Sequence, residues 1–198
     1  MTTDIIDRLA EVRPGSDIDR LRQRRAQART NSQASYDALF NAPEETGVTR
    51  TERLAVAAFV AALHRDDNVQ GHYRTLLEQA AGRELAELVD EAAAAAATEG
   101  PYGRFPATAD LRTEDAPGPV LHLDSTTADE LGQRLTAALQ YAHLLVFRPR
   151  ESSAEALAAL VDAGWSTAQI VTLAQLVAFL SFQLRVVSGL RVLQEAQS

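Results

Sequence analysis

Four side chains in the first half of the chain are of types that could bind or act on a small polar molecule: Glu52, Arg65, Asn68 and His72. An unperturbed histidine has a pKa of about 6.5, so His72 can give and take protons near neutral pH. Asn68 and His72 are four residues apart and share one face of any helix that holds both. The guanidinium of Arg65 could hold a carboxylate through two parallel hydrogen bonds. The set predicts an acid/base site for a small carboxylate.

Each of these residues also has an ordinary structural interpretation. His72 could be a partly buried histidine that donates one hydrogen bond, while Asn68 caps a helix. Glu52 stands three residues after Thr49, which is the spacing of a helix capping box and needs no active site. Arg65 could form a surface ion pair with one of the two aspartates that follow it. The sequence alone leaves both interpretations open.

Several other classes of chemistry are excluded by residues that the chain lacks. It has no cysteine, so a catalytic thiol, a disulfide and a thiolate metal site are excluded. It has no lysine, so Schiff-base chemistry is excluded as well. The four histidines show no metal-binding spacing, and no phosphate-binding glycine loop or α/β-hydrolase nucleophile motif is present. We therefore expect no cofactor and no metal.

The charge of the chain bears on its partners and its location. Its 27 acidic residues outnumber 19 basic ones, for a net charge of −8, which disfavours binding to nucleic acid or to an anionic membrane. Residues 1–29 are the exception, with seven arginines against five acids. A solvated helix, or one that docks on an acidic neighbouring subunit, explains them better than a nucleic-acid contact, since interleaved aromatic residues are missing. Because no signal-length apolar stretch opens the sequence, we expect a cytoplasmic protein.

The elements that would carry these residues are helices. Apolar positions recur at three- and four-residue steps and β-branched residues are sparse, so the pattern predicts an all-α fold of about eight helices. The predicted helices cover approximately residues 17–29, 36–40, 49–63, 68–81, 84–97, 127–147, 152–163 and 167 to the C-terminus.

The domain organisation follows from composition. Residues 1–30 are expected to form a helical arm, and residues 31–198 a single domain whose two helical halves are joined by a proline- and glycine-rich connection over 100–124. The apolar stretch 170–190 is interrupted by polar residues, so it is predicted to be a buried helix rather than a membrane span. Arg185 within it should be paired, with Glu52 or with an acid across a subunit interface.

Three segments of the second half carry a resemblance to a known family. They are Gln140-Tyr141-Ala142, the run Ala-Leu-Ala-Ala-Leu-Val-Asp-Ala-Gly-Trp-Ser over 156–166, and Ala-Phe-Leu-Ser-Phe-Gln-Leu-Arg over 178–185. Together they resemble the alkylhydroperoxidase D-like superfamily, also called the carboxymuconolactone decarboxylase family. The resemblance implies an all-helical fold that assembles as dimers, trimers or hexamers.

The first half is similar to the family's other motif, Cys-x-x-Cys-x-x-x-His preceded by a glutamate. His72 keeps the place of the histidine, Arg65 and Asn68 stand at the two cysteine positions, and Glu52 lies within one residue of the glutamate. Redox-active members use a thiolate as nucleophile, so this chain is not expected to be a thiol peroxidase.

The resemblance then implies a cysteine-less member with cofactor-free proton-transfer chemistry on a small unsaturated carboxylate or lactone. His72 would be the general acid/base, Glu52 would orient it, Arg65 would hold the carboxylate and Asn68 would line the site. The alternative is a non-catalytic oligomeric protein that binds a ligand or a related peroxidase-like protein.

Overall fold

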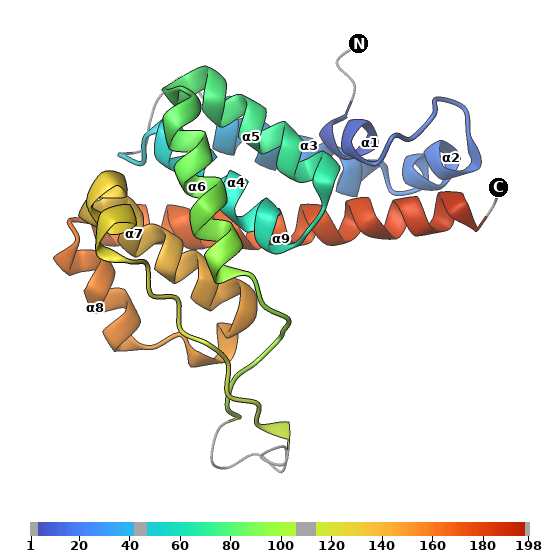
Figure 1. The fold of residues 1–198 in the computed structure, drawn as a ribbon. Coiled ribbons are helices and arrows are strands. Elements are labelled where there is room, and N and C mark those ends of the chain that lie inside the picture. Colours follow the sequence, from blue (N-terminus) through green and yellow to red (C-terminus); the bar gives the residue numbers. More distant parts are fainter. Residues whose placement is uncertain (1–3, 42–46, 106–113, 197–198) are drawn as a thin grey trace.

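The computed structural model describes residues 4–41, 47–105 and 114–196, and over these residues the protein is all-α, as predicted. No strand longer than an isolated bridge occurs among them. Figure 1 labels the helices, which are α1 (Ile5–Leu9), α2 (Asp17–Gln23), α3 (Ala26–Phe40), α4 (Arg50–Leu63), α5 (Asp67–Ala81), α6 (Arg83–Ala96), α7 (Ser125–Phe147), the short 3-10 helix η2 (Pro149–Glu151), α8 (Ala154–Asp162) and α9 (Thr167–Glu195).

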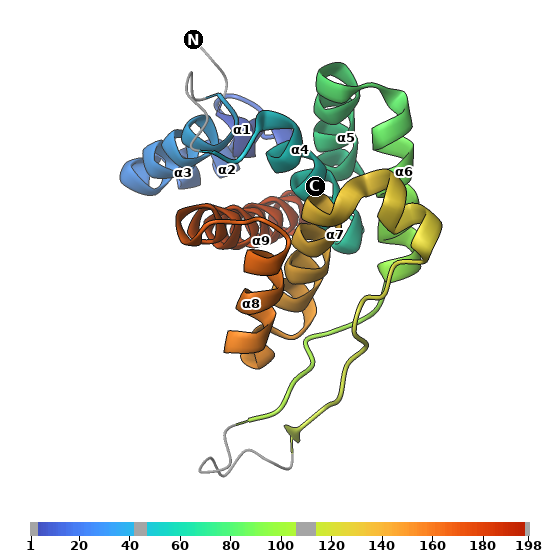
Figure 2. The same cartoon turned by 90° about the vertical axis from the view of Figure 1, so that its left-hand side faces the viewer.

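Helix α4 is the centre of the core. Its residues 54–61 are at most 2% exposed, and six of these eight positions are alanine or valine, which let neighbouring helices approach closely. A helix that is apolar on all sides is expected to be surrounded by others. Helices α5, α6, α7 and α9 all pack on it (Figure 2). The capping box of Thr49 and Glu52 starts the helix as the spacing predicted.

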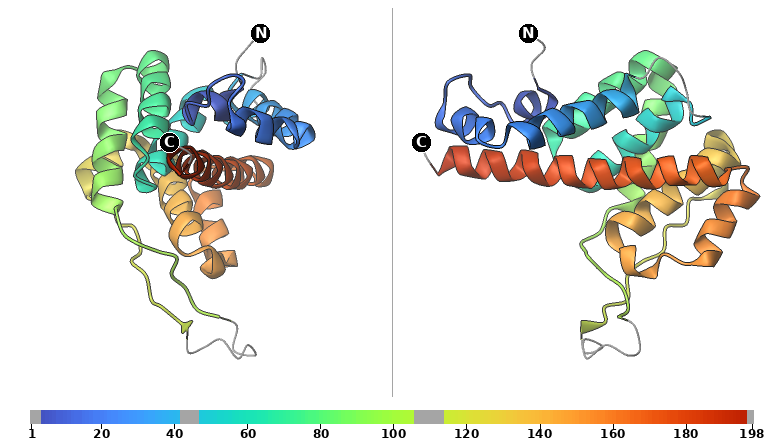
Figure 3. Two further views of the ribbon diagram at one scale, coloured as in Figure 1. Left: turned by 90° about the vertical axis from the view of Figure 1, so that its right-hand side faces the viewer. Right: turned by 180° about the vertical axis from the view of Figure 1, so that it is seen from behind.

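Helix α9 is the longest element and runs along one side of the bundle (Figure 3). Ser166 and Gln169 form the predicted capping box at its start, and one of its faces packs on the core through residues such as Leu173, Leu180 and Val187. Among the described residues it is the one helix long and apolar enough to cross a membrane by length and composition. Of its most apolar 18-residue window, 44% is buried in the fold.

The N-terminal helices differ from the prediction. The first long helix breaks after Gln23 rather than after Arg29, and the next, α3, runs without interruption through residue 30, where the arm was expected to end. Helix α1 was not predicted at all. It is only five residues long and too short to be stable alone, so it depends on burial of Ile5, Ile6 and Leu9.

Two arginines of this arm pair with acids of the same arm. Arg22 donates to Asp4 at 2.6 Å and to Asp7 at 2.7 Å, and Arg29 pairs with Asp7 and, at 3.3 Å, with Asp19. These pairs join α1, α2 and α3 into one unit, and this unit packs on α9. Arg22 and Arg29 therefore hold the helices of the arm together, and the arm packs on α9 of the same chain.

Three helix starts also differ from the prediction. Asp66 caps α5, Asp124 caps α7 and Ser153 caps α8, each accepting a backbone N–H three residues ahead. Helix α7 additionally contains a kink at Gly132, where φ is 77°, a conformation that glycine adopts without strain.

The connection between the two halves leaves the bundle and returns to it (Figures 1 and 2). Gly103 and Ala116 bridge its two described limbs, and the backbone N–H of Tyr102 donates to the carbonyl of Phe147 at 2.6 Å. The guanidinium of Arg150 lies 4.0 Å from the ring centre of Phe105. Residues 106–113 of the predicted connection lie outside the described residues.

Candidate functional site

An open pocket of about 530 Å³ lies where α1, α3 and α5 meet, and it contains His72. Its volume is within the range of small-molecule sites, roughly 300 to 1,000 Å³. Helix α1 contributes a cation, α3 a phenol, an amide and a carboxylate, and α5 the imidazole. The lining residues are Ile5, Arg8, Gln33, Tyr36, Asp37, Asn41, His72, Thr75 and Leu76.

The imidazole of His72 lies between a phenol and a guanidinium. Its Nε2 is 3.0 Å from the hydroxyl of Tyr36, and its Nδ1 is 3.3 Å from Nη2 of Arg8. Nη2 of Arg8 is also 3.5 Å from Nε2, so the guanidinium lies beside both ring nitrogens, and the neutral ring donates to Tyr36 in one tautomer and accepts from it in the other. In the tautomer that donates from Nε2, the hydroxyl proton of Tyr36 can be donated to a ligand.

The surroundings of His72 keep it neutral. Burial first, and the positive charge of Arg8 second, lower the pKa of His72 to about 4. Burial raises the pKa of Tyr36, and Arg8 acts against that rise. At neutral pH the pocket therefore presents an uncharged imidazole, a protonated phenol and the exposed guanidinium of Arg8. The carboxylate of Asp37 also lines the pocket and accepts hydrogen bonds from the side chains of Gln33 and Asn41. Such a set can hold an anion and exchange a proton with it.

Helix geometry explains why these three side chains meet. Gln33, Tyr36 and Phe40 follow one another at three- and four-residue steps and therefore share one face of α3. The side chain of Gln33 accepts the backbone N–H of Ile5 at 2.7 Å, which fixes α1 and hence Arg8 beside this face. The rings of Tyr36 and Phe40 are 5.1 Å apart. This contact holds the phenol in place.

Helix α5 is anchored from two sides. At its N-terminus Asp66 accepts a hydrogen bond from the backbone N–H of Val69. Asp66 also pairs with Arg191 of α9, whose Nη1 lies 2.9 and 3.0 Å from the two carboxylate oxygens. Deeper in the core, the hydroxyl of Tyr73 donates to Gln183 at 2.6 Å, and burial raises the pKa of Tyr73 well above its usual value. His72 thus projects from a helix whose position and rotation are both fixed.

Glu52 does not reach His72. One of its oxygens accepts the backbone N–H of Thr49 at 2.8 Å and the other accepts Nε of Arg134 at 2.5 Å. The cause is the α4–α5 hairpin: Glu52 lies about 17 Å along α4 from the turn, whereas His72 lies only about 8 Å beyond it along α5. The expectation that Glu52 orients His72 has no support in this geometry, and its structural interpretation as a capping residue is confirmed.

Arg65 and Asn68 also have partners outside the His72 pocket. Nη1 of Arg65 is 3.8 Å from Glu99, and both side chains are largely exposed, so this is a surface ion pair, though not with the adjacent aspartates. The side chain of Asn68 donates to Glu11 at 3.0 Å and does not cap α5. The structure therefore brings neither residue to His72.

Arg185 is not paired with Glu52 either. Its Nη1 donates to the carbonyl of Ser181, one turn earlier in the same helix, at 2.9 Å. Its guanidinium also acts on His64, because burial first and Arg185 second lower the pKa of that histidine. The expected pairing of Arg185 with Glu52 is wrong because Arg134 already holds that carboxylate.

Two residues that line the pocket, Arg8 and Tyr36, were missed by sequence reasoning. Tyr36 is only the first residue of the short helix predicted over 36–40, and Arg8 lies in a helix that was not predicted. The usable signal was the pattern Ile5, Ile6, Leu9 behind the capping residue Asp4, which marks a helix with an apolar face.

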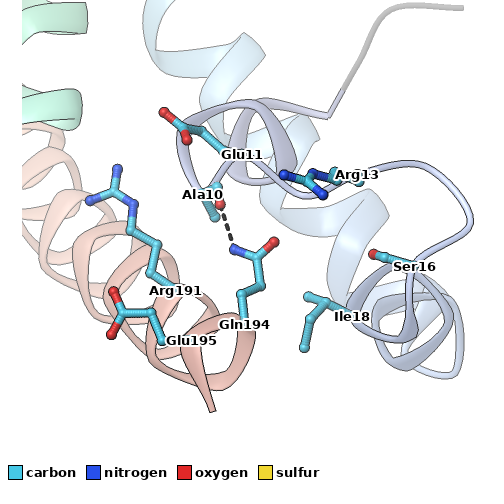
Figure 4. Close-up of a pocket in the computed structure, with 8 residues that line it drawn as sticks. All are labelled: Ala10, Glu11, Arg13, Ser16, Ile18, Arg191, Gln194 and Glu195. Atoms are coloured by element: carbon cyan, nitrogen blue, oxygen red, sulfur yellow. Dashed lines mark hydrogen bonds between the residues drawn. The ribbon is translucent and has the colours of Figure 1, made fainter. Parts of the chain in front are cut away.

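A second open pocket, of about 450 Å³, lies between the α1–α2 loop and the end of α9 (Figure 4). Its wall carries two cations, Arg13 and Arg191, and two anions, Glu11 and Glu195. Arg191 is already engaged by Asp66 and by the carbonyl of Leu9. Over the described parts of the chain, no three histidine or acidic side chains gather as a metal-ligand group.

Comparison with known proteins adds no identity, since neither a family model nor a curated protein matches this chain. The likeness to the carboxymuconolactone decarboxylase family therefore rests on the motifs described above.

Proposed function

We propose that this protein binds a small carboxylate in the pocket between α1, α3 and α5 and exchanges a proton with it without a cofactor. The observation that carries the proposal is a neutral His72 that bonds to the hydroxyl of Tyr36 and lies beside the exposed guanidinium of Arg8. Arg8 holds the carboxylate in the role first expected of Arg65. His72 is the general base, and Tyr36 donates a hydrogen bond to the bound molecule.

The charge of Arg8 links binding to basicity. In the empty pocket it repels the protonated form of His72 and contributes to the low pKa. A bound carboxylate neutralises that charge, so the pKa of His72 rises towards the ordinary 6.5. The imidazole thus becomes a stronger base when the substrate is present. The same coupling makes carboxylate binding tighter as the pH falls towards 5, because binding then takes up a proton.

The proposal includes a relation to the cysteine-less branch of the alkylhydroperoxidase D-like fold. In support, the three family-like segments of the second half are neighbours in space, since α7, α8 and α9 pack on one another. Without cysteine the ancestral thiol chemistry has no nucleophile, and acid/base work on a carboxylate or lactone is the chemistry that the pocket still supports.

The alternative is a non-catalytic oligomeric protein that binds a ligand or a related peroxidase-like protein. One observation favours it: Glu52, Arg65 and Asn68 all serve structural contacts away from His72. Under this alternative the pocket binds without turnover.

The first experiment is a thermal-shift panel of small carboxylates and lactones on the wild type, Arg8→Ala and His72→Ala, with Arg24→Ala as control. Arg24 is an exposed arginine of the same arm that does not line the pocket. A ligand at 100 times its Kd stabilises the folded state by about 2.7 kcal/mol. We expect carboxylates to stabilise the wild type and the control but not Arg8→Ala. If no carboxylate stabilises the wild type, the pocket does not serve this function.

The second experiment separates binding from chemistry. A carboxylate that binds is incubated with the protein in D₂O, and replacement of its carbon-bound hydrogen by deuterium is followed by NMR. We expect exchange with the wild type, and loss of exchange but not of binding with His72→Ala. Binding without exchange in the wild type would select the non-catalytic alternative.

A further inference from the structure

Another open pocket, of about 420 Å³, lies where the turn between α4 and α9's neighbour α5 meets α9, and its lining is rich in basic groups. Arg65 comes from the turn and Arg185 from α9, and both are exposed. Asp66 also lines this pocket, but its carboxylate is paired with Arg191 at 2.9 Å. None of the lining residues belongs to the pocket of His72. The pocket is therefore a separate place at which a ligand could bind.

The two guanidiniums of this pocket are held only weakly. Nη1 of Arg65 is 3.8 Å from Glu99, and the two side chains are 60% and 89% exposed. An ion pair as exposed as this one contributes little to stability, so a ligand can displace Glu99 at low cost. Nη1 of Arg185 donates to the carbonyl of Ser181, a group without net charge. In a chain whose net charge is −8, two such arginines in one pocket form a local site for an anion.

The backbone of Arg65 indicates that its side chain has a use. Its φ is 56°, in the left-handed region, and it directly follows His64, the C-cap of α4. Glycine is the usual residue at this place after a helix, because a side chain there costs conformational energy. Residues held in such strained conformations cluster at binding and catalytic sites. An arginine at a position that suits glycine is thus a second, independent indication of a binding site.

His64 adds a hydrogen-bonding group to the wall of the pocket. Its Nε2 is buried and has no hydrogen-bond partner in the described parts of the chain. Buried polar atoms are nearly always bonded, so this nitrogen marks a place where a partner is expected. Burial first, and Arg185 second, lower the pKa of His64, so the ring is neutral at pH 7 and the charge of Arg185 reaches it. Helix α9 leaves room beside the ring's pocket, since Ser188 is exposed and a Cβ at Gly189 would meet no atom within 4 Å.

We propose that this pocket binds the phosphate group of a small phosphomonoester. Such a group carries a charge of about −1.5 to −2 at pH 7 and presents three acceptor oxygens. Its charge balances Arg65 and Arg185 together, whereas a monocarboxylate would leave one of the two guanidiniums unbalanced. The planar fork of a guanidinium also fits two phosphate oxygens at once.

The rest of the pocket suits an organic phosphate better than the free ion. The hydroxyl of Ser188 can donate to the remaining oxygen, and the ring of His64 is the further donor on this wall. The volume of about 420 Å³ lies within the range of small-molecule sites, roughly 300 to 1,000 Å³. It therefore leaves room for the organic part of the ligand.

The test is a calorimetric titration of the full chain with glycerol phosphate, inorganic phosphate and succinate at constant ionic strength. We expect glycerol phosphate to bind most tightly of the three. Arg65→Gly and Arg185→Gln should each raise its Kd at least about tenfold, because each removes hydrogen bonds between charged groups. Arg24→Ala, the loss of an exposed arginine that does not line the pocket, should leave the Kd unchanged. Arg65→Gly should melt no lower than the wild type, since glycine adopts the left-handed backbone without strain, and this separates lost binding from lost folding.

Glu99→Gln tests the same contact with the opposite sign. It removes the acid that competes for Arg65, so the Kd for glycerol phosphate should fall. Arg8→Ala should leave this Kd unchanged, and loss of binding in that variant would place the phosphate in the pocket of His72 and overturn the proposal. Three other results would also overturn it: no binding of glycerol phosphate to the wild type, an unchanged Kd in both Arg65→Gly and Arg185→Gln, or tighter binding of inorganic phosphate or succinate than of glycerol phosphate.

Discussion

Arg8→Ala should raise the pKa of His72 by about one pH unit. The pKa is now about 4 against an ordinary value of 6.5, with burial as the larger cause and Arg8 as the second. Arg8 therefore accounts for less than half of the lowering. Coulomb's law agrees with this share: two unit charges 4 Å apart interact by about 1 kcal/mol in water and about 4 kcal/mol at an effective dielectric constant of 20. Because Arg8 is exposed, its effect lies near the lower value, and one pH unit corresponds to about 1.4 kcal/mol.

The measurement is an NMR titration of the imidazole Cε1–H resonance of His72 in the wild type, Arg8→Ala and Arg24→Ala. The expected pKa values are about 4, about 5 and about 4. Arg24→Ala removes the same charge at a residue that does not line the pocket, so it controls for the net charge of the protein. An unchanged pKa in Arg8→Ala would refute the electrostatic coupling on which the proposed function depends. A return to 6.5 would show that burial is not the larger cause.

Three further predictions concern stability. Tyr73→Phe removes the hydroxyl that donates to Gln183, a fully buried residue whose Nε2 has no partner. Urea unfolding should show that the free energy of unfolding falls by about 1 to 3 kcal/mol. A fall of less than about 0.5 kcal/mol would contradict this. The guanidinium of Arg134 lies 3.9 Å from the ring centre of Trp165 and donates to the carbonyls of Gly47 and Gly164. Arg134→Ala should therefore lower the melting temperature and shift the tryptophan fluorescence to longer wavelength. An unshifted fluorescence spectrum would argue against the contact between Arg134 and Trp165. The pKa of His72 is lower in the folded state than in the unfolded chain, so His72 lowers the free energy of unfolding as the pH falls from about 6.5 to about 4. His72→Gln should make the free energy of unfolding depend less steeply on pH over this range. An equal slope in the wild type and in His72→Gln would contradict the low pKa.

Local sequence signals predicted much of the fold. The capping boxes at Thr49 and at Ser166 involve residues three apart, so the pattern contains both partners, and the structure has both. Helix α1 escaped prediction because its five residues are held by burial against distant helices rather than by propensity. The break after Gln23 escaped for a related reason, since it lets Arg22 and Arg29 meet the same aspartate on α1.

The candidate site could be predicted only in part. His72 stands out by type, and the structure places it in a pocket. Its partners come from 36 residues away, at Tyr36, and 64 residues away, at Arg8, and no spacing rule connects positions so far apart. Glu52 shows the opposite case. Its local role in a capping box was predictable, whereas its contact with Arg134 depends on the packing of α4 against α7.

The most direct test of the central claim is an NMR titration of His72 in the presence of the carboxylate that stabilises the protein best. The account predicts that the bound carboxylate moves the His72 resonance and raises its pKa from about 4 towards 6.5, and that Arg8→Ala abolishes both effects. A carboxylate that binds with the pKa of His72 still at about 4 would place the ligand elsewhere and contradict the proposed site.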